Sequence, residues 1–189
     1  MKIIVYVQGI GDVEQRFLVK LKKNLEWVLK DFINAVDISQ NSIPLYDSEY
    51  DSIRRQYDAS RILVRLKEIF QKSDQISILG VIDEDIYSHF NNYVFGVAEK
   101  QFLNSSGIAI ISITRLKEEF YRRPEDDALL ELRTLKEAFH ELGHTFGLKH
   151  CENHCIMRYS KRLANTDEKP PLLCESCLEN VKYFFSKIS

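Results

Sequence analysis

The stretch HELGHTFGLKHCENHCIM, residues 140–157, is rich in side chains that bind metals. It contains four of the chain's five histidines and two of its four cysteines. In a helix, His140 and His144 lie one turn apart and within about 40° of each other. Two imidazoles in this arrangement can bind one zinc ion. Glu141 lies beside them and could reach a water on that ion without being a ligand itself.

A third protein ligand has to come from a turn that follows this helix. Gly147 has no Cβ, so it can adopt a positive φ at the helix end and reverse the chain. The reversed chain would bring His150 back to complete a site of three histidines. Such a site leaves the fourth zinc position open, which is typical of catalytic rather than structural zinc.

The four cysteines form a second candidate metal site. Cys151 and Cys155 are a close pair, and Cys174 and Cys177 form a later Cys-x-x-Cys, which is the spacing of a structural zinc site. The alternative is a set of buried or disulfide-bonded cysteines, but the chain shows no secretory signal pattern, and this favours metal. His154 could replace one thiolate, although with four cysteines present we expect it to be a solvated loop residue.

The motif HELGHTFGLKH matches the metzincin signature His-Glu-x-x-His-x-x-Gly-x-x-His. The order of the cysteines behind it resembles the archaemetzincins, as do the segments RRQYDASRIL (Arg54–Leu63) and FGVAE (Phe95–Glu99). The resemblance covers most of the chain. It implies a metallopeptidase with two zinc ions, one catalytic and held by the three histidines, the other structural and held by the four cysteines.

The resemblance also implies roles for two residues behind the motif. Met157 is similar to the methionine that metzincins place in a tight turn beneath the three histidines, although filling a gap in the core is the commoner role of methionine. Tyr159 is similar to the tyrosine near the zinc in the astacin and serralysin branches. Its phenol could stabilise a developing oxyanion, or the ring could simply pack beneath the site.

The chemistry expected of the histidine site is peptide hydrolysis. Zinc with an open position polarises a carbonyl and lowers the pKa of its water, and Glu141 would act as general base. An extended peptide would pair with an edge strand, for which the candidate is NNYVFGVAEK (Asn91–Lys100). A zinc-binding protein of the same fold with little peptidase activity is the alternative, because a motif does not prove that substrate reaches the site.

Two other classes of protein fit the sequence poorly. A zinc deaminase needs His-x-Glu and a proline before its cysteines, whereas His140 and Glu141 are adjacent and Leu173 precedes Cys174. A nucleic-acid-binding zinc module would surround its cysteines with Lys and Arg, whereas CENHC and CESCLEN are acidic. We therefore expect a peptide or protein substrate and no nucleic acid.

The periodicity of the sequence predicts the elements that position the motif. An unbroken apolar run at residues 3–7 predicts a buried strand, and apolar-rich segments at 35–38, 76–82, 93–98 and 108–114 predict further strands. Helical patterns follow from residues 17, 58, 126 and 178. On the long helix expected at residues 126–148, a core-facing stripe recurs at three-and-four spacing: Leu132, Leu135, Phe139, Leu142 and Phe146. By the same rotation the motif histidines point away from the core. His89 is expected to be structural or exposed.

The predicted fold class is α+β with an α/β-like N-terminal part, in a metzincin-like single domain. A mixed twisted β-sheet and a long active-site helix would fill an upper subdomain at about 1–147. A small irregular lower subdomain at about 148–189, ending in a helix, would contain the methionine turn and the cysteines. The 189 residues are 44% hydrophobic, enough for one core, and the formal charge of −2 points to neither nucleic acid nor an anionic membrane. With no span long enough for a bilayer, we expect a cytoplasmic monomer.

Overall fold

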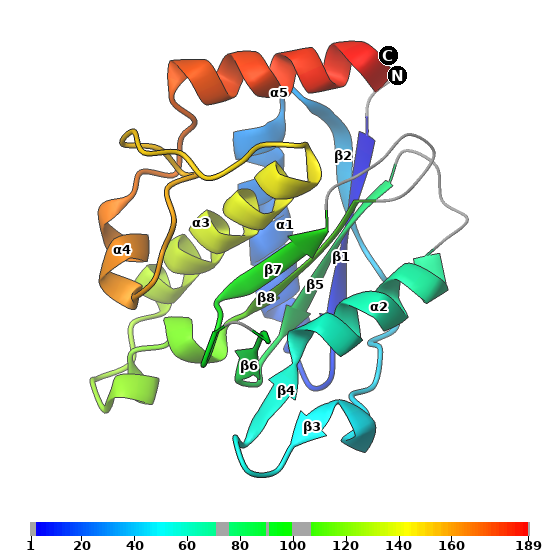
Figure 1. Cartoon of the computed structure of the whole chain (residues 1–189), viewed down its shortest axis with the longest axis vertical. Coiled ribbons are helices and arrows are strands. Elements are labelled where there is room, and N and C mark those ends of the chain that lie inside the picture. Colours follow the sequence, from blue (N-terminus) through cyan, green and yellow to red (C-terminus); the bar gives the residue numbers. More distant parts are fainter. Residues whose placement is uncertain (1–2, 71–75, 90, 100–106, 189) are drawn as a thin grey trace.

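The computed structural model describes residues 3–70, 76–89, 91–99 and 107–188 (Figure 1). The strands are β1 (Ile3–Ile10), β2 (Ile33–Ile38), β3 (Tyr50–Asp51), β4 (Gln56–Asp58), β5 (Ile76–Ile82), β6 (Ile86–Tyr87), β7 (Gly96–Glu99) and β8 (Gly107–Ser112). The α-helices are α1 (Gln15–Leu29), α2 (Ala59–Phe70), α3 (Asp127–Thr145), α4 (Leu163–Glu168) and α5 (Glu175–Ile188). Short 3-10 turns occur at Asp47–Glu49, Thr114–Leu116 and Glu119–Tyr121.

The main sheet has five strands in the order β2-β1-β5-β8-β7. The first four are parallel, and β7 runs antiparallel to β8 at the edge, with Val97 opposite Ile110. This confirms the mixed sheet and places an edge strand within the expected segment, although Lys100 at its end lies outside the described residues. A second sheet, β3-β4-β6, was not predicted because its strands have two or three residues, too few to show a period.

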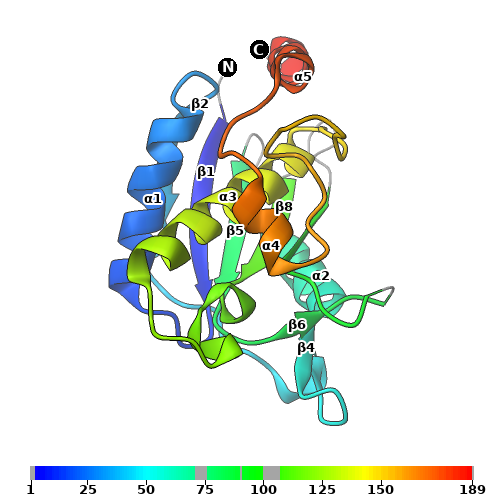
Figure 2. The same ribbon diagram turned by 90° about the vertical axis from the view of Figure 1, so that its left-hand side faces the viewer.

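Helices cover both faces of the main sheet (Figures 1 and 2). On one face, α1 and α3 pack on alternate residues of the strands, such as Val5, Val7 and Val81. On the other face, α2 packs on the intervening residues, such as Ile78 and Ile110. Because both faces are buried, the parallel strands have the nearly continuous apolar sequences from which they were predicted.

Helix α3 begins at the predicted residue, where the Asp126 carboxylate accepts a hydrogen bond from the Leu129 N–H at 2.9 Å. The core stripe is confirmed at four of its five positions: Leu135, Phe139, Leu142 and Phe146 are buried. The prediction for Leu132 is wrong, since this residue is 40% exposed. It lies in the N-terminal half of the helix, where the chain does not cover it.

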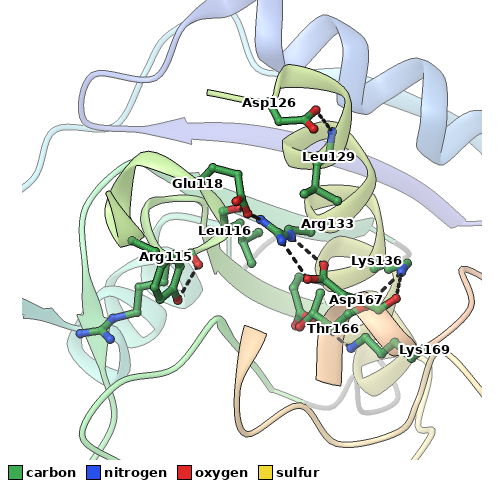
Figure 3. A network of polar contacts seen from close by, with 12 residues as sticks. Arg115, Leu116, Glu118, Asp126, Leu129, Arg133, Lys136, Thr166, Asp167 and Lys169 are labelled. Carbon is green, nitrogen blue, oxygen red and sulfur yellow. Dashed lines mark hydrogen bonds and ion pairs between the residues drawn. The ribbon is translucent and has the colours of Figure 1, made fainter. Parts of the chain in front are cut away.

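The opposite face of α3 is also buried, which a one-sided amphipathic pattern does not predict. Arg133 donates to the carboxylate of Asp167 through two nitrogens, at 2.6 and 2.8 Å, and to Glu118 at 2.5 Å (Figure 3). Lys136 donates to the backbone carbonyls of Thr166 and Asp167. These charged side chains join α3 to α4, a helix of six residues that was not predicted.

The chain ends in a helix, as expected, although α5 begins three residues earlier than its periodicity indicated. Aromatic contacts attach α5 to the rest of the fold. Phe185 stacks on Phe32 after α1 and lies against Phe146 at the end of α3, with ring centroids 5.9 and 5.2 Å apart. No helix among the described residues is long and apolar enough to cross a membrane.

Candidate metal centre and active site

The turn after α3 has the geometry predicted from Gly147. This residue has a φ of 83°, and its N–H donates to the His144 carbonyl at 2.9 Å. The Leu148 N–H donates to the Gly143 carbonyl at 3.0 Å, which completes a Schellman motif. The reversed chain places the ring of His150 4.8 Å from that of His144.

The three histidines converge through their ring nitrogens. His140 Nδ1 donates to the Ile156 carbonyl and His144 Nδ1 to the Leu148 carbonyl, both at 2.9 Å. These bonds assign the ring protons to Nδ1, so both Nε2 lone pairs are free, and the two Nε2 atoms lie 3.1 Å apart. Two nitrogens bound tetrahedrally to zinc at about 2.0 Å would be about 3.3 Å apart. One ligand nitrogen from each of His140, His144 and His150 lies within 4.8 Å of the others.

The electrostatic environment keeps these imidazoles neutral, which is the form that binds metal. Burial lowers the pKa of His140 well below its ordinary value, and the positive charge of Lys169 adds to this effect. Burial also lowers the pKa of His144 and of His150. The backbone carbonyls that hold the Nδ1 protons act as the outer partners that orient metal-binding histidines in proteins.

Glu141 is buried beside the histidines and in contact with the edge strand. A Cβ on Gly96 of β7 would lie 2.6 Å from Glu141 Cγ and 2.7 Å from Oε1, so only glycine leaves room for this carboxylate. Burial raises the pKa of Glu141 well above its ordinary value, and the neighbouring Glu137 raises it further. Gly96 therefore allows the helix and the edge strand to approach each other at this residue.

A buried ion pair lies next to Glu141. Lys169 Nζ is 3.0 Å from Glu137 Oε1, and both side chains are almost inaccessible, at 1% and 3% exposed. The contact lacks the alignment of a hydrogen bond, whereas Thr166 Oγ1 donates to the same Glu137 oxygen at 2.7 Å. Lys169 thus offsets the Glu137 charge, and it lowers the pKa of Glu141 against the effect of burial.

The four cysteines form the second cluster. Their sulfurs all lie within 4.8 Å of one another, and Cys151 Sγ is 3.7 Å from Cys174 Sγ. Thiolates on a tetrahedral zinc at about 2.3 Å would be about 3.8 Å apart. Hydrogen bonds from Asn153 and Ser176 lower the pKa of Cys174 to about 5, whereas burial raises the pKa of Cys155. The residues therefore fit a closed thiolate site.

Met157 lies beneath α3 as the resemblance implied. It is fully buried, and its sulfur fills the space that a side chain at Gly143 would occupy. Its carbonyl accepts a hydrogen bond from the Cys151 N–H at 3.0 Å, which closes the loop between the first two cysteines. His154 and His89 are exposed and belong to neither cluster, as expected.

The histidines line a cleft with a volume of about 760 Å³. One wall is the segment 91–98, which includes part of β7, and the opposite wall is formed by residues 147–150 and 159–162. Tyr159 is 50% exposed, and its ring centroid lies 4.9 Å from that of His150. The Tyr93 hydroxyl donates to the Lys161 carbonyl at 2.9 Å and so joins the two walls.

A model of one known family, peptidase family M54, matches residues 5–183. The chain belongs to peptidase family M54. Among relatives, the archaemetzincin of Pyrococcus furiosus is 38% identical over 184 residues, which is 96% of this chain and 94% of the relative. The archaemetzincin of Methanocaldococcus jannaschii is 36% identical over 179 residues, which is 93% of this chain and 91% of the relative.

Solved structures of an archaemetzincin and of a zinc-dependent peptidase have the same fold. A zinc-dependent peptidase from Methanocorpusculum labreanum superposes with a TM-score of 0.82 at 30% identity, and archaemetzincin from Archaeoglobus fulgidus, complexed with malonate, with 0.78 at 31%. Each match covers 94% of this chain and 99% of the other. Metalloproteinase-II from Bacteroides fragilis shares the fold at 14% identity, with a TM-score of 0.59 over 97% of this chain and 52% of that protein.

These matches confirm the archaemetzincin resemblance, the α+β fold class and the interpretation of the chain as a zinc metallopeptidase. The M54 site also contains residues that the sequence analysis missed. Gly143, near the C-terminal end of α3, was a visible signal of close packing against Met157, because glycine weakens a helix unless packing requires it. Glu137 and Lys169 gave no comparable signal, since their pairing depends on how the C-terminal segment folds onto α3.

Proposed function

We propose that this metallopeptidase hydrolyses peptides at a catalytic zinc ion held by His140, His144 and His150, with Glu141 as general base. The observation that supports this most directly is the convergence of the Nε2 atoms of His140 and His144, both freed by Nδ1 bonds to the backbone, beside a buried carboxylate. The three histidines would hold the ion from α3 and from the turn after it, and all three line the cleft that a substrate would enter.

When bound, zinc supplies a Lewis acid that polarises the scissile carbonyl, makes a water more acidic and favours the ionised form of a nearby carboxyl. Glu141 then accepts a proton from the attacking water and returns it to the leaving amine. The carboxylate is held in place, because the Glu141 side chain extends from α3 and packs against Gly96 of β7. A fixed carboxylate keeps the proton transfer within hydrogen-bond reach.

The substrate is proposed to bind as an extended peptide along β7. This strand is an edge of the main sheet, and it pairs only with β8 among the described residues. The side away from β8 offers N–H and C=O groups that a peptide strand can pair with irrespective of its side chains. Main-chain pairing would align the scissile carbonyl with the histidines at the other wall of the cleft.

Tyr159 is the proposed hydrogen-bond donor to the developing oxyanion. Its ring lies against His150 at the mouth of the cleft, and its half-exposed position leaves the hydroxyl accessible. Losing one such donor typically raises the barrier by about 2.7 to 4 kcal/mol. The Tyr159→Phe variant would keep the packing of the ring, so an unchanged turnover would show that the residue only packs there.

A second zinc is proposed at Cys151, Cys155, Cys174 and Cys177. Cys151 directly follows His150, so this closed site would fix the loop that presents the third histidine.

Thiolate ligands persist in a reducing compartment, and we propose a cytoplasmic protein on that basis. Since one chain contains the whole cleft, we propose a monomeric single domain with subdomains at about 1–147 and 148–189.

The test is the Glu141→Gln variant, with Glu125→Gln as its matched control on an exposed residue before α3. Both proteins are assayed for zinc content and for cleavage of a mixed peptide library, with and without a chelator. We expect Glu141→Gln to retain the zinc and to lose hydrolysis by about a hundredfold or more, because the general base is removed without a ligand. Chelator-sensitive hydrolysis that survives in Glu141→Gln would refute the assignment.

A further inference from the structure

The exposed charged residues that line the cleft are all basic. Lys149, Lys161 and Arg162, here called the basic rim, lie on the wall opposite β7. None of the three forms an ion pair within the part of the chain that the structure describes. Some arginines elsewhere have carboxylate partners, such as Arg115 with Asp85, and others, such as Arg55, have none among the described residues, so the rim is distinguished by its place at the cleft.

The two acidic residues that line the cleft do not offset the rim. Glu137 and Glu141 are 2% and 5% exposed, so neither carboxylate is at the surface that a peptide meets. The charge of Glu137 is also offset by Lys169 at 3.0 Å. The accessible lining of the cleft therefore has a positive charge, although the chain as a whole has a formal charge of −2.

Hydrogen bonds to neighbouring residues hold two members of the rim at the cleft. The Lys161 carbonyl accepts the Tyr93 hydroxyl from the other wall at 2.9 Å. The Arg162 N–H donates to Asn165 Oδ1 at 3.1 Å, at the start of α4. Lys149 directly precedes the third histidine. The rim thus lies along the cleft that also contains the three histidines.

We propose that this peptidase selects acidic peptides, with Asp or Glu side chains near the scissile bond that pair with the basic rim. The proposal rests on the proposed function and adds its substrate class. A peptide is favoured over a nucleic acid because β7, along the other wall, has one edge that pairs with no strand among the described residues and so matches a polypeptide backbone. Three cations are also few for a nucleic-acid site in an acidic chain.

The test measures binding rather than turnover, so that it does not depend on catalysis. Zinc-loaded Glu141→Gln protein is titrated with three fluorescent peptides that differ only in having Glu, Gln or Lys at the residues flanking one central bond. We expect the Glu peptide to bind about tenfold more tightly than the Gln peptide, because two or three partly exposed ion pairs together contribute an affinity difference of this size. The Lys peptide should bind least tightly. The preference should shrink in 0.5 M salt, because screening weakens exposed pairs.

The rim is then removed by adding Lys149→Gln, Lys161→Gln and Arg162→Gln, and the matched control is Lys23→Gln, an exposed lysine on α1 outside the cleft. We expect the rim variant to bind the Glu and Gln peptides within about twofold of each other, and Lys23→Gln to keep the full preference. Equal affinity for the three peptides, a preference that survives without the rim, or no binding of any peptide would overturn the proposal. Tighter binding of a single-stranded oligonucleotide than of the Glu peptide would also overturn it. Hydrolysis of neutral peptides by the unmodified chain would in those cases still support the proposed function.

Discussion

Replacing Gly96 with alanine should impair catalysis without touching a metal ligand. The new Cβ would lie 2.6 Å from Glu141 Cγ, 2.7 Å from Oε1 and 2.8 Å from Cδ. Carbon atoms in contact normally lie about 3.5 Å or more apart, so Glu141 or β7 has to move by roughly 1 Å. Both lie in a packed region, since Glu141 is buried near the C-terminal end of α3, against β7. A displacement of this size at a catalytic group can reduce the rate about a hundredfold.

The assay compares kcat/KM, zinc content and thermal unfolding of Gly96→Ala with those of Gly107→Ala. Gly107 on β8 is a matched control, because its Cβ would lie 2.7 Å from Thr145 Cβ, a similar overlap away from Glu141. Overpacking should destabilise both variants by about 1 to 3 kcal/mol. Only Gly96→Ala should lose about a hundredfold in kcat/KM while retaining its zinc. Comparable activity of the two variants would refute the idea that Gly96 positions the general base.

Three further predictions concern the turn, the cysteines and the α3–α4 network. Gly147→Ala forces a residue with a Cβ to adopt a φ of 83°, so zinc affinity should fall about tenfold as His150 shifts, measured by chelator competition; an unchanged affinity would contradict the role of this turn. In zinc-free reduced protein, Cys174 has a pKa of about 5 and should be alkylated first by iodoacetamide at pH 7, since a thiolate reacts and a thiol does not. Asn153→Ala should raise that pKa and slow the labelling, and mass spectrometry that finds another cysteine labelled first would refute the assignment. Arg133→Met removes the cation that Asp167 and Glu118 share, although Glu118 keeps Arg123, and should reduce the free energy of unfolding by about 2 kcal/mol, measured in urea; a loss below about 1 kcal/mol would show that the network contributes little.

The sequence predicted those features that depend on local periodicity. Continuous apolar runs located β1, β5 and β8, because strands buried on both faces need apolar residues at every position. The motif located the histidines and the turn at Gly147 because ligand spacing and helix termination are local properties. The same reasoning found the edge strand through its short apolar run between polar residues.

The features that the sequence did not reveal depend on contacts between distant segments. Leu132 fits the core stripe of α3, yet it is 40% exposed, because the periodicity of one helix does not show how far along it the neighbouring elements pack. The opposite face is buried by α4, a helix too short to show a period, through side chains such as Arg133 that would usually be solvated. Gly96 and Lys169 act on Glu141 from β7 and from the C-terminal segment, and no spacing in the sequence relates them to it.

In the proposed mechanism, hydrolysis depends on a zinc ion at the three histidines and not on the zinc proposed at the four cysteines. This dependence is tested most directly by removing the more labile ion with a mild chelator, since an open site exchanges more readily than a closed thiolate site. The protein with its remaining zinc is then titrated with zinc while peptide cleavage and bound metal are measured together. We predict that cleavage is lost with the first ion removed, while the chain stays folded, and that it returns in full with one equivalent of zinc. Cleavage that persists after the labile ion is removed, or one equivalent of zinc rebound without cleavage, would contradict the claim.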